Sequence, residues 1–143
     1  MSACVVSIGD ELLRGVTVDT NSAWLASRLL EMGYRTHMFN CLPDDRPTIA
    51  RKLKQMANEF SIILVTGGLG PTNDDITRDA AAEAFYAPLQ LRPEVVDSIR
   101  RFFVDRGLDM PSQNRRQAEV PKGAKVMAND IGTACGFIFL AVA

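Results

Sequence analysis

Three pairs of acidic residues stand where strands of a parallel sheet are expected to end, and carboxylates placed there could hold a metal ion. The pairs are Asp10-Glu11, Asp44-Asp45 and Asp74-Asp75. In a parallel sheet the turns after the strands share one edge, so these groups can converge on a single crevice. Carboxylate oxygens bind Mg²⁺, and that ion neutralises phosphates and orients an attacking water. Any one pair is better explained as turn or helix-capping residues, whereas three pairs at one edge favour a functional site.

A glycine-rich turn precedes the last of these pairs and is typical of an anion site. Its glycines are Gly67, Gly68 and Gly70. They let the backbone turn sharply and approach a ligand without an intervening Cβ. Four residues that favour helix N-caps follow: Thr72, Asn73, Asp74 and Asp75. Backbone N–H groups and the helix dipole favour a phosphate there. Because the two aspartates would repel a phosphate, we expect a divalent cation between them.

Other kinds of catalytic or nucleotide-binding site do not match the sequence. The glycine turn lacks the Lys-Ser/Thr of a Walker A loop and the third glycine of the dinucleotide-binding fingerprint. No serine lies in a nucleophile elbow. The single histidine, His37, falls inside a predicted strand and reads as a core or edge residue. Carboxylates and a metal therefore remain as the catalytic groups that the sequence offers.

The composition describes one globular domain. The chain has 143 residues, of which 47% are hydrophobic and 23% charged, and its net charge is −1. That length suits a domain with a proper core, and the near-neutral charge argues against a nucleic-acid-binding surface. No apolar run approaches the roughly 20 residues of a membrane span, and no signal peptide is recognisable. Three widely spaced cysteines read as buried free thiols in a reducing compartment: Cys4, Cys41 and Cys135. We therefore expect a cytoplasmic protein.

Alternating strands and helices predict an α/β fold with a mostly parallel sheet. The expected strands of the first half are 3–8, 34–41 and 62–65, with a glycine-bounded loop at 9–15. One helix follows the capping cluster 19–22 and stops at Gly33, and a second begins at Pro47. The second half predicts helices over 77–88, 93–107 and 113–118, a turn at 121–123, and a hairpin of strands 124–127 and 136–141.

The segment Thr66–Thr77 closely resembles the signature of the molybdopterin-binding domain found in molybdenum-cofactor biosynthesis proteins. Its Leu-Gly-Pro-Thr and paired aspartates point to the CinA-like branch, represented by the N-terminal domain of competence/damage-inducible protein A. Further matching pieces follow in order: Gly9–Leu13 with Gly15, Asn21, Trp24–Ala26, Pro43–Asp45, Asn114 with Gln117-Ala118, and Asn129 with Gly132–Ala134. The resemblance covers nearly the whole chain.

This resemblance implies a three-layer α/β/α sandwich, a homo-oligomer (dimer or trimer) and a small-molecule partner, either a nucleotide or a pterin phosphate. In the cofactor-synthesis members, two acidic positions matching Asp44 and Asp75 serve pterin binding or adenylyl chemistry. The CinA-like branch is instead associated with metal-dependent pyrophosphatase activity, notably on ADP-ribose. The alternative is a molybdopterin-binding module without hydrolase activity, and a plainer one is a subunit-association domain.

Carried over to this chain, the resemblance implies particular site residues. Asp44 and Asp75 would be catalytic. The ligands of Mg²⁺ or a similar divalent ion would be Asp10, Asp44 and Asp75. Phosphate would be held by Gly67, Gly68, Gly70 and Thr72, with Asp74 also in the ligand site.

The sequence departs from the family pattern in two places. Cys135 stands where the family usually has proline, which frees φ and adds a backbone donor in a turn. The Leu-Pro-Gly-Val-Pro turn that usually follows the last strand is absent before Ala143. We therefore expect residues 1–143 to be a single domain of this kind, truncated at its C-terminal end.

Overall fold

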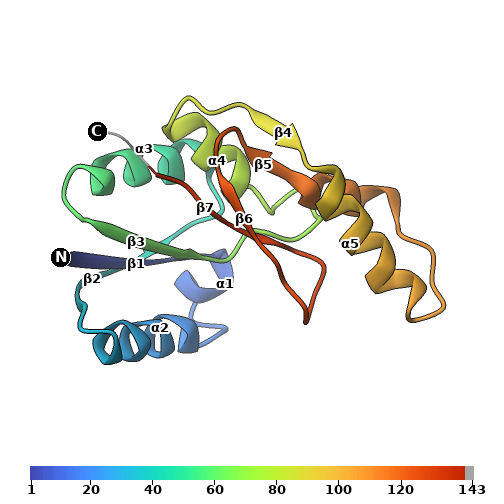
Figure 1. Cartoon of the computed structure of the whole chain (residues 1–143). Helices are drawn as coiled ribbons and strands as arrows, with labels where there is room; N and C mark the ends of the chain where they lie inside the picture. The colour runs from blue at the N-terminus through green and yellow to red at the C-terminus, as the bar shows by residue number, and fades with distance from the viewer. Residues whose placement is uncertain (141–143) are drawn as a thin grey trace. The chain divides into compact units, whose positions relative to one another are not determined.

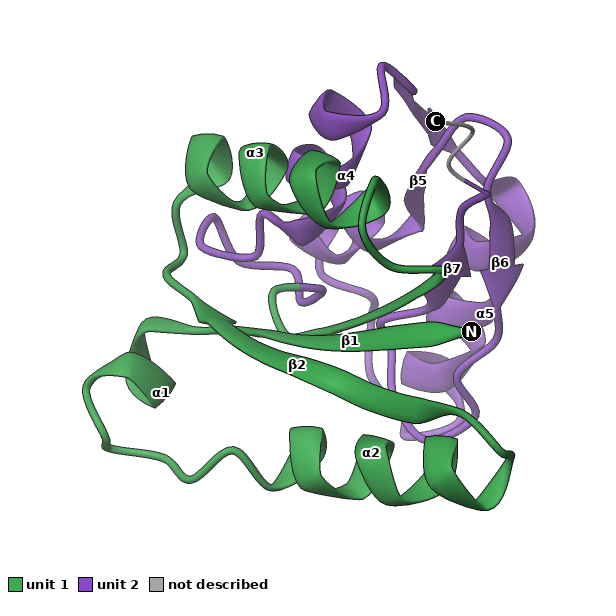
Figure 2. Ribbon diagram, turned by 90° about the vertical axis from the view of Figure 1, so that its left-hand side faces the viewer, with its two compact units in different colours: residues 1–68, 143 green, residues 69–142 purple. Residues whose placement is uncertain are grey.

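The computed structural model describes residues 1–140, which form two compact units divided after Gly68 (Figure 2). The elements of the first unit are β1 (Ser2–Ile8), α1 (Asp10–Leu13), α2 (Thr20–Glu31), β2 (Arg35–Leu42), α3 (Arg46–Ala57) and β3 (Ile62–Thr66). Figure 1 shows the chain with these labels. No helix of the described residues is long and apolar enough to cross a membrane.

The first unit is a parallel sheet of order β2-β1-β3 with a helix on each face. Side chains alternate across the central strand β1, so its two faces meet different helices. Ala3 and Val5 are buried against Leu29 of α2, whereas the Sγ of Cys4 lies 3.5 Å from the Sδ of Met56 in α3. Figure 2 shows α2 and α3 on opposite sides of the sheet. The predicted α/β/α layering with a mostly parallel sheet is thereby confirmed.

Aspartates cap α2 and α3, the two long helices of this unit. The carboxylate of Asp19 accepts hydrogen bonds from the Ser22 backbone N–H (3.0 Å) and hydroxyl (2.6 Å), and Asp45 accepts one from the Thr48 N–H at 3.0 Å. Each bond satisfies a backbone or side-chain donor in the first helical turn. The capping cluster that the sequence indicates at 19–22 therefore begins α2, as expected.

Replacing Asp19 by alanine should lower the free energy of unfolding by about 1 kcal/mol, because the N-cap bonds of α2 are lost. Asp19→Asn keeps a capping side chain and should lose much less.

Burial raises the pKa of Asp19, but the hydrogen bonds from Ser22 and Ser7 outweigh it and hold this pKa below its usual value. A lowered folded-state pKa stabilises the protein above the unfolded pKa, and that contribution disappears as pH falls through the folded pKa. The free energies of unfolding of wild type and Asp19→Asn, measured by urea titration, should therefore become more alike as the pH is lowered. A difference between them that grew on acidification would contradict this prediction.

Over its described residues, 69–140, the second unit consists of three helices and two antiparallel strand pairs. Its elements are α4 (Thr77–Ala84), β4 (Leu89–Leu91), α5 (Pro93–Val104), the 3₁₀ helix η1 (Ser112–Ala118), β5 (Glu119–Pro121), β6 (Lys125–Met127) and β7 (Gly136–Ile138). Strand β4 pairs with β5, and β6 pairs with β7. The apolar face of α5 packs on a buried cluster that includes Ala118, Val120 and Cys135.

Several expectations need correction. Residues Asp10–Leu13 form the short helix α1, where a loop was predicted, because two acidic residues open the turn and favour its N-terminus. The pair β4–β5 was not predicted, since three-residue strands beside Pro88 and Pro121 show no periodicity. The predicted hairpin of 124–127 with 136–141 is confirmed for β6 and β7, while position 141 lies outside the described residues.

The expectation of three buried thiols is also wrong for one cysteine. Cys4 and Cys135 are buried, but Cys41 is exposed. It lies on β2, which is hydrogen-bonded on one side only because it is an edge strand of the sheet. An edge strand has fewer neighbours to cover its side chains, and the sequence does not indicate the strand order.

Candidate functional site

Asp10 and Asp44 are linked by reciprocal hydrogen bonds at the carboxyl edge of the first unit's sheet. Asp10 donates its backbone N–H to the Oδ2 of Asp44 at 3.0 Å, and Asp44 donates its own N–H to the Oδ1 of Asp10 at 3.3 Å. This exchange is possible because β1 and β2 are parallel neighbours; the Gly9 N–H also donates to the Leu42 carbonyl at 3.1 Å. Two of the three predicted carboxylate turns therefore come together.

The glycine turn begins at the same sheet edge, because β3 is the other neighbour of β1. Gly67 has φ of 100°, and a Cβ built on it would lie 2.1 Å from the carbonyl oxygen of Ile8. Gly68 also has a positive φ, 63°. Only glycine adopts such conformations without strain. The predicted sharp turn is confirmed, and the close approach that the structure shows at Gly67 is to the backbone of Ile8, so the predicted approach to a ligand stays a prediction.

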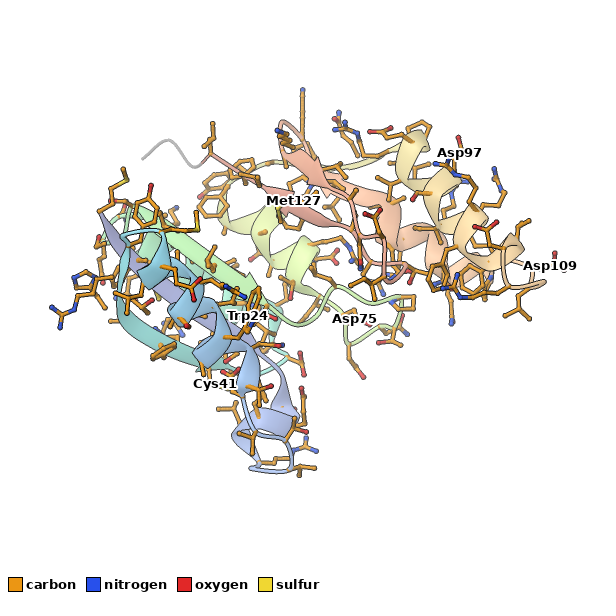
Figure 3. The ribbon with its side chains drawn as sticks, turned by 60° about the horizontal axis from the view of Figure 1, so that its bottom comes forward. Trp24, Cys41, Asp75, Asp97, Asp109 and Met127 are labelled. Carbon is orange, nitrogen blue, oxygen red and sulfur yellow. The ribbon has the colours of Figure 1, made fainter. Side chains whose placement is uncertain are left out.

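The remaining predicted site residues belong to the second unit, where Asp75 organises the loop before α4 (Figure 3). Its Oδ1 accepts the Gly70 N–H at 2.8 Å, and its Oδ2 accepts the Thr72 N–H at 2.8 Å and the Thr72 hydroxyl at 2.5 Å. Burial raises the pKa of Asp75, but these hydrogen bonds and the nearby Arg78 outweigh it and hold the pKa below its usual value. The carboxylate thus stays charged and fixes the loop that contains it.

None of the four predicted N-cap residues caps α4. The N-cap position is Ile76, which makes no side-chain cap hydrogen bond, and Asp75 turns back to Gly70 and Thr72 instead. Asp74 is exposed. The expectation of a side-chain cap failed because a carboxylate can satisfy N–H groups of the preceding loop as well as those of the following helix.

Two arginines hold the carbonyl side of the same loop. Arg78 is 1% exposed and donates to the carbonyls of Leu69 (2.5 Å) and Gly70 (2.9 Å). Arg116 donates to the Thr72 carbonyl at 2.7 Å and pairs with Asp79 at 3.5 Å. Burial lowers the pKa of Arg78, which reflects the cost of removing its charge from water. Loop 69–75 is therefore fixed by an anion at its N–H groups and by cations at its carbonyls.

Arg78 is not among the predicted site residues, but one feature of the sequence points to it. Arg78 is in the first turn of α4, where a positive charge opposes the helix dipole. Its neighbours on that helix, Thr77 and Ala80, are also buried. A basic residue in such a place needs another partner, which here is the glycine loop.

The carboxylate pair of the first unit fits a divalent cation in the type of its donors. Asp10 and Asp44 offer oxygens, which Mg²⁺ prefers. Among residues 1–140, no three His, Cys, Asp or Glu side chains form a metal-binding group. An ion held by these two residues would therefore complete its coordination with water or ligand oxygens, as Mg²⁺ commonly does.

Comparison with known proteins identifies the family of the chain. Residues 4–140 match the family model described as "Probable molybdopterin binding domain". A CinA-like protein of Desulforapulum autotrophicum is 42% identical over 96% of this chain and 32% of its own length, and one of Citrifermentans bemidjiense is 44% identical over 96% and 33%. The chain thus spans about a third of the length of these curated relatives.

Solved structures resemble the chain as well. The crystal structure of CinA from Thermoplasma acidophilum, titled as of unknown function, superposes with a TM-score of 0.87 at 28% identity and covers 96% of this chain and 80% of its own. The molybdopterin biosynthesis enzyme MoaB from Thermus thermophilus has a TM-score of 0.56 at 20% identity, covering 85% and 79%, and so shows a shared fold. The chain therefore belongs to the molybdopterin-binding domain family, and within that family it is similar to the CinA-like proteins.

Proposed function

We propose that the chain is a metal-dependent hydrolase of a nucleotide diphosphate such as ADP-ribose. The observation that carries this proposal is the pair Asp10–Asp44, each of which donates its backbone N–H to the other's carboxylate at the sheet edge where the glycine turn begins. Ligands of open α/β sheets bind at this edge. Carboxylates next to a phosphate site would repel the ligand unless a cation lay between them, which favours metal-assisted chemistry over binding by the protein alone.

In this proposal each group of the chain has a defined task. Asp10 and Asp44 would hold the divalent ion, which would supply neutralisation of phosphate charge and activation of water. The backbone of Gly67 and Gly68 approaches the diphosphate. Water oxygen bonds to one phosphorus, the P–O–P bridge breaks, and the bridging oxygen leaves with the other phosphoryl group. ADP-ribose thereby gives AMP and ribose 5-phosphate, and a carboxylate accepts the proton of the water.

Besides holding its loop in place, Asp75 could also contact a cation. Its Oδ1 accepts a single hydrogen bond, from Gly70, so one lone pair of this oxygen is left for a cation. Within the second unit we therefore propose Asp75 as a catalytic residue that contacts a cation through this oxygen, with Gly70 and Thr72 as proposed phosphate contacts and Asp74 in the ligand site.

The test is release of AMP from ADP-ribose with and without Mg²⁺. Asp44→Asn removes a charge that would bind the metal and should lower the rate about 100-fold. Asp45→Asn is the matched control, because it is the adjacent carboxylate, caps α3, and is replaced by an equally good cap. Asp75→Asn tests the second unit's contribution. No Mg²⁺-dependent AMP release by the wild type, or equal loss in Asp44→Asn and Asp45→Asn, would refute the proposal.

A second candidate function is binding of molybdopterin without hydrolysis, which the description of the matching family favours. Here the glycine turn would hold the pterin phosphate. Calorimetry should then detect molybdopterin binding that weakens in Gly68→Ala, since alanine at φ of 63° is strained. Binding indifferent to this substitution would count against the second candidate.

A further inference from the structure

The second unit contains a cavity that shares only Thr72 with the residues proposed above for phosphate binding. It has a volume of about 540 Å³ and is lined by the segment 71–73, by residues of η1 and by Glu119 of β5. Small-molecule sites typically measure roughly 300–1,000 Å³, so this cavity can receive a ligand of nucleotide size. We call it the Arg115 cavity.

Its lining has the chemistry of an anion site. Arg115, Arg116, Asn73 and Gln113 all carry N–H donors, and Glu119 is the one carboxylate among the lining residues. Guanidinium groups present planar forks of donors that match phosphate oxygens. The charges of the lining therefore favour an anion that accepts several hydrogen bonds.

The two arginines differ in how far they are already engaged. Arg116 is fixed by the Thr72 carbonyl at 2.7 Å and by Asp79 at 3.5 Å. The exposed side chain of Arg115 makes no hydrogen bond or ion pair with any of residues 1–140. One wall of the cavity is thus preorganised, while the guanidinium beside it is available to a ligand.

We propose that the Arg115 cavity binds the phosphate groups of an organic phosphate, with Arg115 as the residue that contacts them. Thr72 links this cavity to the loop that Asp75 organises, because its hydroxyl and N–H serve Asp75 while its carbonyl binds Arg116. The inference rests on the proposed function in its choice of a phosphate ligand, but binding here requires neither the metal nor hydrolysis.

The test is an NMR titration of the full chain with inorganic pyrophosphate, and in parallel with AMP, in the presence of a chelator. Backbone resonances of 72–73 and 113–116 should shift on binding. Arg115→Ala should weaken binding about tenfold, the value of one charge-assisted contact. Glu119→Gln removes the opposing charge and should strengthen binding about threefold. Arg100→Ala, an exposed arginine of α5 paired with Asp97, makes the same charge change outside the cavity and should leave affinity within about twofold.

The opposite signs expected for Arg115 and Glu119 separate local binding from an effect of net charge. Affinity unchanged in Arg115→Ala, an equal loss in Arg100→Ala, or no shift at 72–73 and 113–116 with millimolar pyrophosphate would overturn the proposal. Arg115→Gln gives a second variant that keeps the first part of the side chain and a neutral polar end, and it should behave as Arg115→Ala does. Because no metal is present, pyrophosphate binding that depends on Arg115 would stand even if the protein did not hydrolyse ADP-ribose.

Discussion

Replacing Gly67 by alanine should destabilise the first unit by about 3 kcal/mol or more, enough to unfold a domain of ordinary stability. Two effects combine. The φ of 100° at Gly67 is strained for any residue with a Cβ, and that Cβ would lie 2.1 Å from the Ile8 carbonyl oxygen. Backbone atoms of the central strand cannot move aside as a flexible side chain can. Thermal or urea unfolding of the variant, followed by circular dichroism, measures the loss.

Gly15→Ala provides the matched control for this prediction. Gly15 also has a left-handed φ, 70°, but nothing lies within 4 Å of the Cβ that alanine would add. It should therefore show conformational strain alone, about 1 kcal/mol. If the two alanine variants lost equal stability, the close approach of the glycine turn to β1 would be refuted.

The order of strands and helices in the first unit followed from the sequence because each element has a local signal. Branched apolar runs at 3–8 and 62–65, the capping cluster at Asp19 and the proline at 47 depend on neighbours in sequence. The meeting of Asp10 with Asp44 also followed, since parallel strands end at one edge. Their reciprocal hydrogen bonds did not follow, because these depend on β1 and β2 being neighbours rather than separated by β3.

Long-range partners were harder to infer. Asp75 is of a residue type that favours the N-cap position, but its hydrogen-bond partners are Gly70 and Thr72 of the preceding loop. Arg116 donates a hydrogen bond to Thr72, which lies more than 40 positions earlier in the sequence. The periodicity of a sequence does not indicate contacts between residues so far apart. The sequence therefore indicated that the glycine loop is a candidate ligand site, and the structure adds the charged side chains that hold the loop in place.

The strongest test of how the loop is fixed is removal of the buried guanidinium. Arg78→Met should lower the free energy of unfolding by about 3 kcal/mol, because two carbonyls lose their donors and methionine cannot replace them. Arg78→Lys keeps a cation but not the fork that reaches both Leu69 and Gly70, so its loss should be intermediate. Arg101→Met, at an exposed position of α5, should stay within about 0.5 kcal/mol of wild type.

Hydrogen exchange should show the amides of Gly70 and Thr72 less protected in Arg78→Met, since Asp75 then holds them in a loop whose carbonyl side is free to move. Unchanged protection at these two amides would mean that Asp75 fixes the loop alone and that Arg78 contributes to stability only through packing.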